Sequence, residues 1–443
     1  MPEKICPAEV LDEECDQIIN MGLKVKYGQE VKSFREFLKS DYDAIFVGTG
    51  APKGKDLNIP GREEASKNIH IGIDFLASVA FEHVSKIGKK VIVLGGGNTA
   101  MDCCRTAIRL GGKQVGVYVR SPKVDMKASD WEIEEAEMEN IPIFENHVPK
   151  EFLIKDGKLR GMLFEKVTAH YENNKRKLVP TGEPLVEVEC DDVLMAIGQD
   201  NAFEWIEKDL GIEFGEWDMP KVNKITMQSS LPKVFFGGDA AWGPENIITA
   251  VAHAHQAAIS IDLFCNGKDL TERPEPHVFL KSSKMGLHEW SYDNGYDEVS
   301  RLSVPHADLK STLKDRKLEV ELGYDDEMAF KEASRCLNCD AQTVFEESRC
   351  IECDACVDIC PEDCINFIEN ADEEELRSKL RVPALNLEED LYVSDILPTS
   401  RVMVKDEDLC LHCGLCAERC PTGAWDMQKF FYMGAQAKDG CSK

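Results

Sequence analysis

Two cysteine runs with the same spacing lie near the C-terminal end of the chain, and they constrain its fold more than any other feature. The first run is Cys350-x2-Cys353-x2-Cys356-x3-Cys360, followed by Pro361, and the second is Cys410-x2-Cys413-x2-Cys416-x3-Cys420, followed by Pro421. Three thiolates on such a loop reach three corners of a [4Fe-4S] cube, and the fourth ligand comes from the other run. The spacing therefore predicts one cluster on Cys350, Cys353, Cys356 and Cys420, and another on Cys410, Cys413, Cys416 and Cys360.

Zinc and disulfide bonds are the alternatives to clusters. Zinc ribbons pair two thiols from each loop and do not account for a four-cysteine run that ends in Cys-Pro. Nothing at the start of the sequence resembles a secretory signal, so we expect a cytoplasmic protein with reduced thiols. This tail resembles the bacterial two-cluster ferredoxins, and the resemblance implies a path for single electrons.

Composition excludes several classes of protein. The 443 residues carry 52 Lys and Arg against 81 Asp and Glu, a net charge of -29. Such a charge argues against binding to nucleic acid or to an anionic membrane. It serves solubility or the docking of a basic partner. Hydrophobic residues make up 43% of the chain, and no uncharged apolar run approaches the roughly 18 residues of a membrane span. We therefore expect a globular protein of two or three domains.

A glycine-rich turn follows the apolar segment Lys89 to Leu94. The turn has the G-x-G-x-x-A pattern and opens a predicted helix. In a dinucleotide fingerprint the first glycine makes the turn, the second admits the pyrophosphate, and the alanine allows close packing of helix and strand. The unpaired N–H groups at the helix start attract phosphate. The predicted cofactor-binding residues are Gly95, Gly97, Asn98, Thr99, Ala100 and Asp102; a glycine turn without a ligand is the alternative.

A cation stands at the end of the next predicted strand, Gln114 to Val119. NAD sites often place an acidic residue there on the ribose 2′-hydroxyl, whereas this chain has Arg120 followed by Ser121. A guanidinium suits the 2′-phosphate of NADP, while stacking of Arg120 on adenine would also suit NAD. The pattern predicts NAD or NADP, with Arg120 and Ser121 close to the adenosine.

Three other apolar segments, each predicted as a strand, end in small residues: the first at Gly48 to Ala51, the second at Ala196 to Gly198 and the last at Gly238. Small residues leave room for a ligand against the backbone. After the last strand, Asp239 is suited to accept a hydrogen bond from a ribityl hydroxyl. A helix predicted to start at Asn246 would direct its N-terminal dipole at a reduced flavin, and we expect His253 and His255 within it to pack or cap. The predicted flavin-side residues are Gly48, Thr49, Gly50, Ala51, Ala196, Gly198, Gly238, Asp239 and Asn246.

These segments together resemble the small, pyridine-nucleotide-oxidising subunit of glutamate synthase and its relatives among the two-dinucleotide flavoproteins. The resemblance covers roughly residues 5–265 and implies FAD, NAD(P)H and hydride transfer between them. The implied fold is α/β, with two Rossmann-like domains, joined to an α+β ferredoxin-like domain with two [4Fe-4S] clusters. We predict a partial FAD-binding domain (1–57 and 190–265), an NAD(P)-binding domain (58–189), a linker (266–335) and the ferredoxin-like domain (336–443).

One departure from this family concerns the flavin. Family members hold the ADP half of FAD on an N-terminal strand, G-x-G-x-x-G loop and helix, and this sequence contains a loop of that kind only at Gly95. Either another subunit supplies the missing half of the FAD site, or the site is a relic. The intact flavin-side segments favour the first hypothesis. We therefore expect the chain to work within a complex.

Several other segments carry local predictions. Pro7 to Gly22 is predicted as a helix packed on a sheet, and Leu23 to Tyr27 as a short strand. Residues 362–409 are predicted to form an acidic loop, either solvated or used for docking. Cys336 and Cys339 are interpreted as buried thiols; a third cluster, with Cys364, Cys441 or a ligand from a partner subunit, is the alternative.

The combined prediction is an electron-transfer flavoprotein subunit of a larger anaerobic oxidoreductase. Hydride would pass directly between nicotinamide and flavin, so no catalytic side chain is predicted, and single electrons would pass to the clusters. By resemblance to phenylglyoxylate and 2-oxoglutarate oxidoreductases, the complex would oxidise a 2-oxoacid and reduce NAD(P)+. The alternatives are a glutamate synthase small subunit and a non-catalytic iron-sulfur wire.

Overall fold

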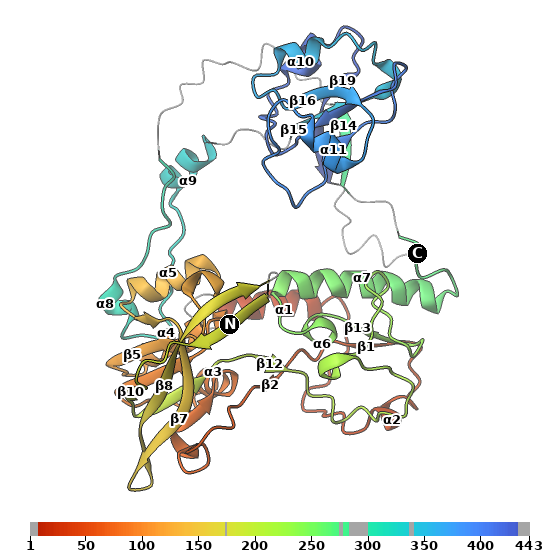
Figure 1. Cartoon of the computed structure of the whole chain (residues 1–443). Coiled ribbons are helices and arrows are strands. Elements are labelled where there is room, and N and C mark those ends of the chain that lie inside the picture. The colour runs from red at the N-terminus through yellow and green to blue at the C-terminus, as the bar shows by residue number, and fades with distance from the viewer. Residues whose placement is uncertain (1–7, 173–174, 274–277, 283–299, 336–340, 433–443) are drawn as a thin grey trace. The chain divides into compact units, whose positions relative to one another are not determined.

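The computed structural model of the chain is described for residues 8–172, 175–273, 278–282, 300–335 and 341–432. The residues divide into two compact units (Figure 1). The first unit comprises Met1–Arg273 with Val304–Gly323, and the second comprises Pro274–Ser303 with Tyr324–Lys443. Cys336, Cys339 and Cys441 lie outside the described residues, so the predictions about them stay predictions.

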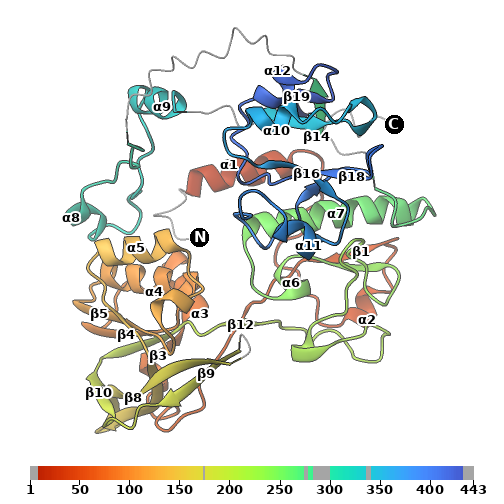
Figure 2. The same ribbon diagram turned by 45° about the horizontal axis from the view of Figure 1, so that its top comes forward.

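A five-stranded parallel sheet forms one half of the first unit. Its order is β3 (Ile69–Ile71), β11 (Asp192–Met195), β4 (Lys90–Leu94), β5 (Gln114–Tyr118) and β6 (Ile143–Phe144). β4 is apolar because both faces of the sheet are covered. Val91 and Val93 pack among the helices α3 (Gly72–Ala80), α4 (Asn98–Arg109) and α5 (Asp130–Met138), which are labelled in Figure 2. Ile92 and Leu94 point to the opposite face.

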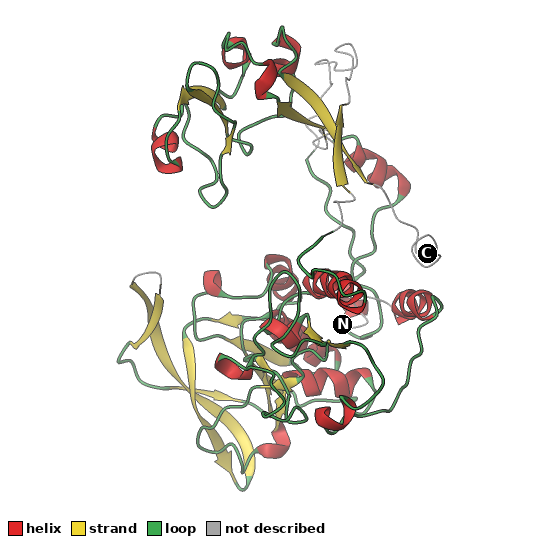
Figure 3. Cartoon of the chain, turned by 90° about the vertical axis from the view of Figure 1, so that its right-hand side faces the viewer, coloured by secondary structure: helices red, strands yellow, loops and turns green. Residues whose placement is uncertain are grey.

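A four-stranded antiparallel sheet covers that opposite face. The strands are β7 (His147–Lys155), β8 (Lys158–Glu172), β9 (Lys175–Pro180) and β10 (Val186–Glu189), and β8 pairs with the other three. All strands are yellow in Figure 3. Asp156 and Gly157 both have positive φ and make the two-residue hairpin between β7 and β8. Phe152 and Phe164 from this sheet pack with Ile92 and Leu94.

The other half of the first unit is built around two short strands. β1 (Ile45–Val47) pairs in parallel with β13 (Val234–Phe236), and β2 (Lys53–Gly54) pairs with β12 (Gln199–Asp200). Ile45, Val47, Val234 and Phe236 pack on Phe34 of α2 (Phe34–Phe37) and on α6 (Asp239–Trp242). On the other face, Phe235 of β13 contacts Phe264 of α7 (Ile247–Cys265). Among the described strands, β1 has β13 as its only neighbour.

Two predictions near the N-terminus are wrong. α1 (Ala8–Ile19) is a helix, but Val10, Leu11 and Ile18 are each more than half exposed, so these apolar side chains do not pack on a sheet. Residues 23–27 form no strand. The helical spacing of apolar residues in α1 predicted its conformation correctly, but it could not tell whether a covering layer is present.

The helix α7 passes a test of length and composition for a membrane span. It has 19 residues and a mean hydropathy of 1.3, but only 17% of its apolar stretch is buried. Its apolar residues Ile248 and Val251 are 81% and 50% exposed. One face of the helix packs on β13, as the contact between Phe264 and Phe235 shows, while the rest of its apolar surface has no cover among the described residues.

A buried charged cluster holds α4 against α5. Arg105 and Arg109 of α4 both bind the Glu139 carboxylate, at 2.8 Å and 2.7 Å. Burial acts to raise the pKa of Glu139, but hydrogen bonds from Arg109 and Arg105 outweigh it and leave the pKa below its ordinary value. Residues of the predicted linker extend this cluster, because His306 Nε2 lies 3.4 Å from Glu135. The short helix α8 (Leu309–Thr312) also belongs to this segment of the first unit.

The second unit contains two three-stranded antiparallel sheets. In one, β19 (Trp425–Tyr432) lies between β14 (Val278–Ser282) and β15 (Ala341–Phe345); in the other, β18 (Arg401–Lys405) lies between β16 (Ile365–Glu369) and β17 (Tyr392–Val393). The helices are α9 (Asp326–Ala333), α10 (Ala355–Ile359), α11 (Glu373–Ser378) and α12 (Leu415–Arg419). The prediction of a loop over residues 362–409 is wrong, because α11 and three strands lie there. Leu376, Val402 and Val404 give this region its own small core.

Candidate functional site

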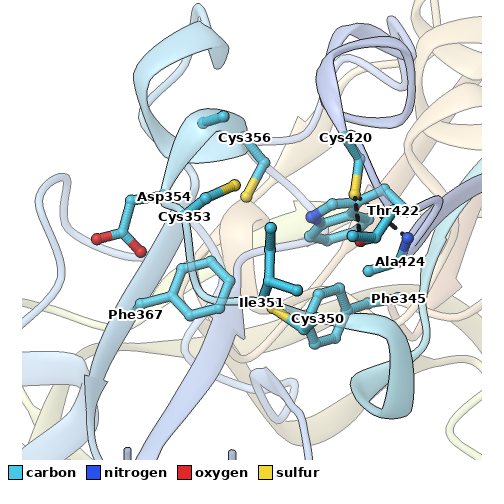
Figure 4. A pocket seen from close by; sticks show the side chains of 12 residues that line it. Phe345, Cys350, Ile351, Cys353, Asp354, Cys356, Phe367, Cys420, Thr422 and Ala424 are labelled. Carbon is cyan, nitrogen blue, oxygen red and sulfur yellow. Dashed lines mark hydrogen bonds between the residues drawn. The ribbon is translucent and has the colours of Figure 1, made fainter.

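Four cysteines from the two runs line one hollow of the second unit, which we call site I (Figure 4). Cys350, Cys353 and Cys356 come from the first run, and Cys420 ends α12 in the second. The hollow has an empty volume of about 290 Å³ and an aromatic lining of Phe345, Phe367 and Trp425. Backbone N–H groups of Glu352 and Ala424 donate to the sulfurs of Cys350 and Cys420, at 3.3 Å and 3.2 Å.

The other four cysteines line a second hollow, site II, of about 310 Å³. Cys410, Cys413 and Cys416 come from the second run, and Cys360 ends α10 in the first. The N–H of His412 donates to Cys410 Sγ at 3.4 Å. Both loops turn through positive φ at matching positions, at Glu352 and Asp354 in one and at His412 and Gly414 in the other. The structure thus brings together the two sets of four thiols that the spacing predicts.

Site II also contains a fifth cysteine. Cys364 lines the hollow, is buried, and places its Sγ 3.5 Å from Cys360 Sγ. Hydrogen bonds from Cys364 are the main cause that lowers the pKa of Cys410 to about 5 and that of Cys360 to about 6. Burial instead raises the pKa of Cys356 to about 11 and that of Cys416 to about 12. Thiolates are the metal-binding form of cysteine, so Cys360 and Cys410 are already suited to bind iron.

The glycine-rich turn connects β4 to α4, as predicted. The fold and the ligand place different demands on its two key glycines. Gly95 has a φ of +132°, and a Cβ there would lie 2.1 Å from the carbonyl oxygen of Ala196. Gly97 has an ordinary extended backbone, and a Cβ there would meet nothing within 4 Å. The fold therefore requires a glycine at position 95, whereas the open space at Gly97 is free for a ligand.

The remaining residues predicted around this turn lie at the start of α4 and at the end of β5. Asn98 and Thr99 begin α4, Ala100 is fully buried against the sheet, and Asp102 follows on the same helix. The Asn98 side chain accepts a hydrogen bond from the N–H of Ser129 at 2.9 Å. After β5, Arg120 is exposed and forms no ion pair with any described residue, whereas Ser121 is buried. An exposed, unpaired guanidinium at this edge of the sheet can receive an anion.

The flavin-side segments meet around β1 and β13. Gly50 and Gly238 have φ of +70° and +59°, and Gly238 leads directly into Asp239 at the start of α6. Asp239 Oδ1 accepts the N–H of Glu245 at 3.1 Å. Asn246 caps α7 by accepting the N–H of Thr249 at 2.8 Å. A Cβ at Gly50 would meet nothing within 4 Å, whereas a Cβ at Gly238 would lie 3.2 Å from Ala250 Cβ on α7.

Ala51 and Ala196 are buried. Gly198, which directly precedes the strand β12 where it pairs with β2, has a φ of +125°. The Lys55 N–H donates to Gly198 O at 3.0 Å, which ties the segments on either side of the nicotinamide half together. His253 packs as predicted: its Nδ1 accepts the N–H of Gly238 at 3.2 Å, and its ring lies 4.4 Å from that of Trp242.

Sequence reasoning missed two residues of these sites. With its amide oriented to satisfy both acceptors, Asn201 donates to the carbonyls of Asp239 and Gly50 at 3.1 Å and 3.2 Å, and so joins two flavin-side segments. Lys405 is fully buried beside site II, where its Nζ donates to Thr343 Oγ1 at 2.9 Å. Neither lies in a recognisable motif, and a lysine next to acidic residues is ordinarily a surface residue.

Comparison with known families assigns both halves of the chain. Residues 8–258 match the model described as pyridine nucleotide-disulphide oxidoreductase, and residues 349–424 match that of a 4Fe-4S dicluster domain. The first match covers more than half of the sequence. The chain belongs to the pyridine nucleotide-disulphide oxidoreductase family. Its cofactors are therefore FAD, NAD(P) and two [4Fe-4S] clusters, and the predicted resemblance is confirmed.

Individual members of the family with detectable similarity are redox-enzyme subunits. The chain is 30% identical to the β subunit of an NADP(+)-dependent formate dehydrogenase from Moorella thermoacetica, over 76% of this chain and 48% of that one. It is 29% identical to the β subunit of an NADPH-Fe(3+) oxidoreductase from Geobacter sulfurreducens, over 75% and 54%. It is 30% identical to the small chain of glutamate synthase [NADPH] from Escherichia coli, over 57% of each chain. The chain spans about half the length of these relatives.

Solved structures give a looser match. Thioredoxin reductase of T. acidophilum aligns with a TM-score of 0.41 and 21% identity, over 51% of this chain and 66% of that one. FprA of Mycobacterium tuberculosis in complex with NADPH aligns with a TM-score of 0.44 and 16% identity, over 52% and 66%.

The residues at sites I and II fit iron-sulfur clusters. At site I the buried indole of Trp425 lies in the lining beside Cys356, and its N–H is a donor suited to sulfur. Each hollow adds four thiols and backbone N–H donors aimed at sulfur, which is the donor set of a [4Fe-4S] cluster. For the nucleotide, the space left open at Gly97 fits a pyrophosphate at the start of α4.

Proposed function

We propose that this chain is the NADP(H)-reactive flavin and iron-sulfur subunit of a multi-subunit oxidoreductase. In this proposal residues 58–189 bind NADP(H), residues 1–57 and 190–265 form one side of the FAD site, and residues 336–443 hold the clusters at sites I and II. Residues 266–335 connect the two units. FAD, when bound, exchanges hydride with the nicotinamide and single electrons with the clusters.

The side chains of this subunit position cofactors and transfer no protons. The α4 N-terminus at Asn98 and Thr99 holds the pyrophosphate with backbone N–H groups, and Gly97 leaves the space for it. Arg120 and Ser121 lie where the adenosine ribose is expected. The backbone at Gly50 and Gly238, with the Asp239 carboxylate, would hold the flavin side chain, and the N-terminus of α7 would stabilise negative charge on the ring.

NADP is the nicotinamide cofactor that we propose. Arg120 is exposed and has no ion-pair partner among the described residues, so its guanidinium is available for a 2′-phosphate. The names of the three relatives above point the same way, because they specify NADP(+) or NADPH.

The observation that carries the proposal for the flavin site is the incomplete cover of β1 and α7. Parallel sheets are normally larger than two strands and are covered on both faces. In the part of the chain that the structure describes, β1 has one neighbouring strand, Phe46 on the side that carries α7 is 39% exposed, and Ile248 and Val251 of α7 are exposed. An apolar surface of this kind marks an interaction site.

The occupant that we propose for this surface is the ADP-binding half of the FAD domain, supplied by a partner subunit. A strand, glycine loop and helix would add to the free edge of β1 and cover α7 with apolar side chains. The described residues contain one strand–glycine loop–helix unit of this kind, at Gly95 to Ala100, and it lies in the nicotinamide half. The relatives, about twice as long as the matched region, contain further sequence beside it.

For the reaction of the complex we retain the hypothesis of 2-oxoacid oxidation coupled to reduction of NADP+. Formate is the second candidate substrate, because one relative is the β subunit of a formate dehydrogenase. A glutamate synthase-type role is a third, from the relative in Escherichia coli. Turnover by the native complex with each substrate, under anaerobic conditions, distinguishes the three.

FAD content tests the proposed division of the flavin site. The isolated chain should bind FAD weakly, and the native complex should hold one FAD for each copy of the chain. Val251→Asp would bury a carboxylate under the partner at a cost of several kcal/mol, so both partner binding and FAD retention should fall at least about 100-fold. Phe81→Asp, at a residue 73% exposed beyond α3, is the matched control and should change neither. Stoichiometric FAD on the isolated chain would refute the proposal.

A further inference from the structure

Sites I and II are built from one repeated motif, but the side chains around them are not equivalent. Residues that hold the same place relative to each run are Phe345 and Lys405, Ala424 and Cys364, Glu352 and His412, and Asp354 and Gly414. In each pair the first residue belongs to site I and the second to site II. The replacements at site II thus introduce a cation and a thiol, and they remove two carboxylates.

Lys405 is the largest of these differences. Its side chain is fully buried, and its Nζ donates to Thr343 Oγ1 at 2.9 Å and to Glu407 Oε2 at 2.8 Å. Thr343 lines site II, with its hydroxyl 4.0 Å from Cys410 Sγ. The ammonium therefore lies directly behind the first cysteine of site II. Phe345, which takes the equivalent place at site I, offers no charge.

Cys364 is the second difference, and like Lys405 it stabilises negative charge at site II. Its buried Sγ is 3.5 Å from Cys360 Sγ, so its S–H can donate to a ligand of site II. Ala424, the equivalent residue at site I, has no side-chain donor and provides only its backbone N–H to Cys420. A hydrogen bond to a cluster ligand stabilises the added negative charge of the reduced state.

Carboxylates near both sites disfavour added negative charge, so their effect must be compared with that of Lys405. At site I the Glu352 and Asp354 carboxylates are each 3.1 Å from the Arg401 guanidinium, so the three groups leave a net negative charge. At site II, Glu407 pairs with Lys405 and Glu362 lines the hollow, so the three groups named there also sum to one negative charge, and the difference between the sites lies in their burial. The Glu407 side chain is 44% exposed and is screened by water, whereas the Lys405 side chain has no exposure. The field at site II therefore favours the more negative, reduced cluster.

We propose that Lys405 and Cys364 make site II the electron-accepting end of the cluster pair. This inference rests on the proposed occupancy of both sites by [4Fe-4S] clusters. One electron then passes from the cluster at site I to the cluster at site II, oxidising the first and reducing the second, with no proton transferred and no bond broken. An electron that enters the second unit resides on site II at least ten times more often than on site I, which corresponds to about 59 mV for a one-electron couple.

A redox titration followed by electron paramagnetic resonance tests this inference on the full chain, reconstituted anaerobically. Iron and sulfide contents of about eight each per chain establish that both clusters are present, independently of their potentials. The wild-type chain should titrate in two steps, and Cys413→Ser should alter the spectrum of the cluster reduced first. If iron and sulfide are absent, the proposed function fails; if both clusters are present but titrate at one potential, only this inference fails.

Variants around site II then identify the cause. Lys405→Met and Cys364→Ala should each lower the potential of the site II cluster and bring the two steps together, whereas Glu407→Gln should separate them further. Lys379→Met removes an exposed ammonium from the same unit and should leave both potentials unchanged. If Lys405→Met fails to fold, the opposite shifts expected for Cys364→Ala and Glu407→Gln still decide the matter. Equal shifts of both clusters, or no shift in these two variants, would overturn the inference.

Discussion

Replacement of Gly97 by valine should separate nucleotide binding from folding. A Cβ at this position meets nothing within 4 Å, and the backbone φ of -107° is ordinary for any residue, so the free energy of unfolding should change by less than about 1 kcal/mol. The branched side chain would, however, occupy the space in front of the α4 N-terminus. Two hydrogen bonds from N–H groups to a charged pyrophosphate are worth about 1.5 to 3 kcal/mol each. Their loss should weaken NADPH binding at least about 100-fold.

Calorimetric titration of the full chain with NADPH, together with thermal unfolding, measures both quantities. Gly95→Ala provides the contrasting variant, because its Cβ would lie 2.1 Å from Ala196 O and its φ is +132°. That substitution should lower the unfolding temperature as well as NADPH binding. If Gly97→Val binds NADPH as tightly as the wild type while remaining folded, the nucleotide does not lie at this turn and the argument from the open space is wrong.

Three other perturbations test the charged groups. Arg120→Gln should raise the KM for NADPH about 10- to 100-fold and leave that for NADH unchanged, because only NADPH carries the 2′-phosphate; steady-state kinetics of the complex with both cofactors decides this. Glu139→Gln removes the carboxylate that Arg105 and Arg109 share; Arg105 keeps Glu135 and Glu132, whereas Arg109 stays buried without an ion-pair partner among the described residues. The substitution should cost about 3 to 5 kcal/mol in urea unfolding, with the exposed Glu30→Gln as control. Burial acts to raise the pKa of Asp192, but hydrogen bonds from His70, Asn68 and the Gly88 N–H outweigh it and lower the pKa below its ordinary value. The contribution of Asp192 to stability is therefore complete above about pH 4 and is lost as the pH falls further. Asp192→Asn should therefore flatten the acid side of the stability curve measured by urea unfolding, and an unchanged acid side would contradict this assignment.

The cysteine runs made the grouping of thiols at sites I and II predictable. Three cysteines on one short loop cannot close a cube, so the fourth had to come from the other run, and the spacing identifies Cys420 and Cys360 for that place. The environment of each site was not predictable in the same way. Lys405 ends β18 and precedes acidic residues, a pattern typical of a surface lysine, and only the tertiary contact with Thr343 of β15 places it in the interior.

The glycine turn at Gly95 was predictable because an apolar strand, three glycines and a helix together leave one plausible geometry. The flavin-side segments were recognisable only as strands ending in small residues. Their connection through Asn201 depends on contacts between residues far apart in sequence, and no local pattern marks it. The wrong predictions at α1 and Leu23–Tyr27 have a related cause, since apolar periodicity reports that a face is suited to burial and does not report what covers it.

The helix α7 also has an apolar face whose cover the sequence does not identify. Its length and hydropathy alone are those of a membrane span, yet His253 in the helix accepts the N–H of Gly238 and Phe264 contacts Phe235. One face is therefore bound to β13 and its loop, and a helix held in this way cannot be surrounded by lipid. The apolar residues left exposed, Ile248 and Val251, lie on a helix that begins beside the proposed flavin site. A protein layer over the exposed face of α7 is compatible with the binding of its other face to β13. A bilayer would explain the apolar exposed face but not the bound one.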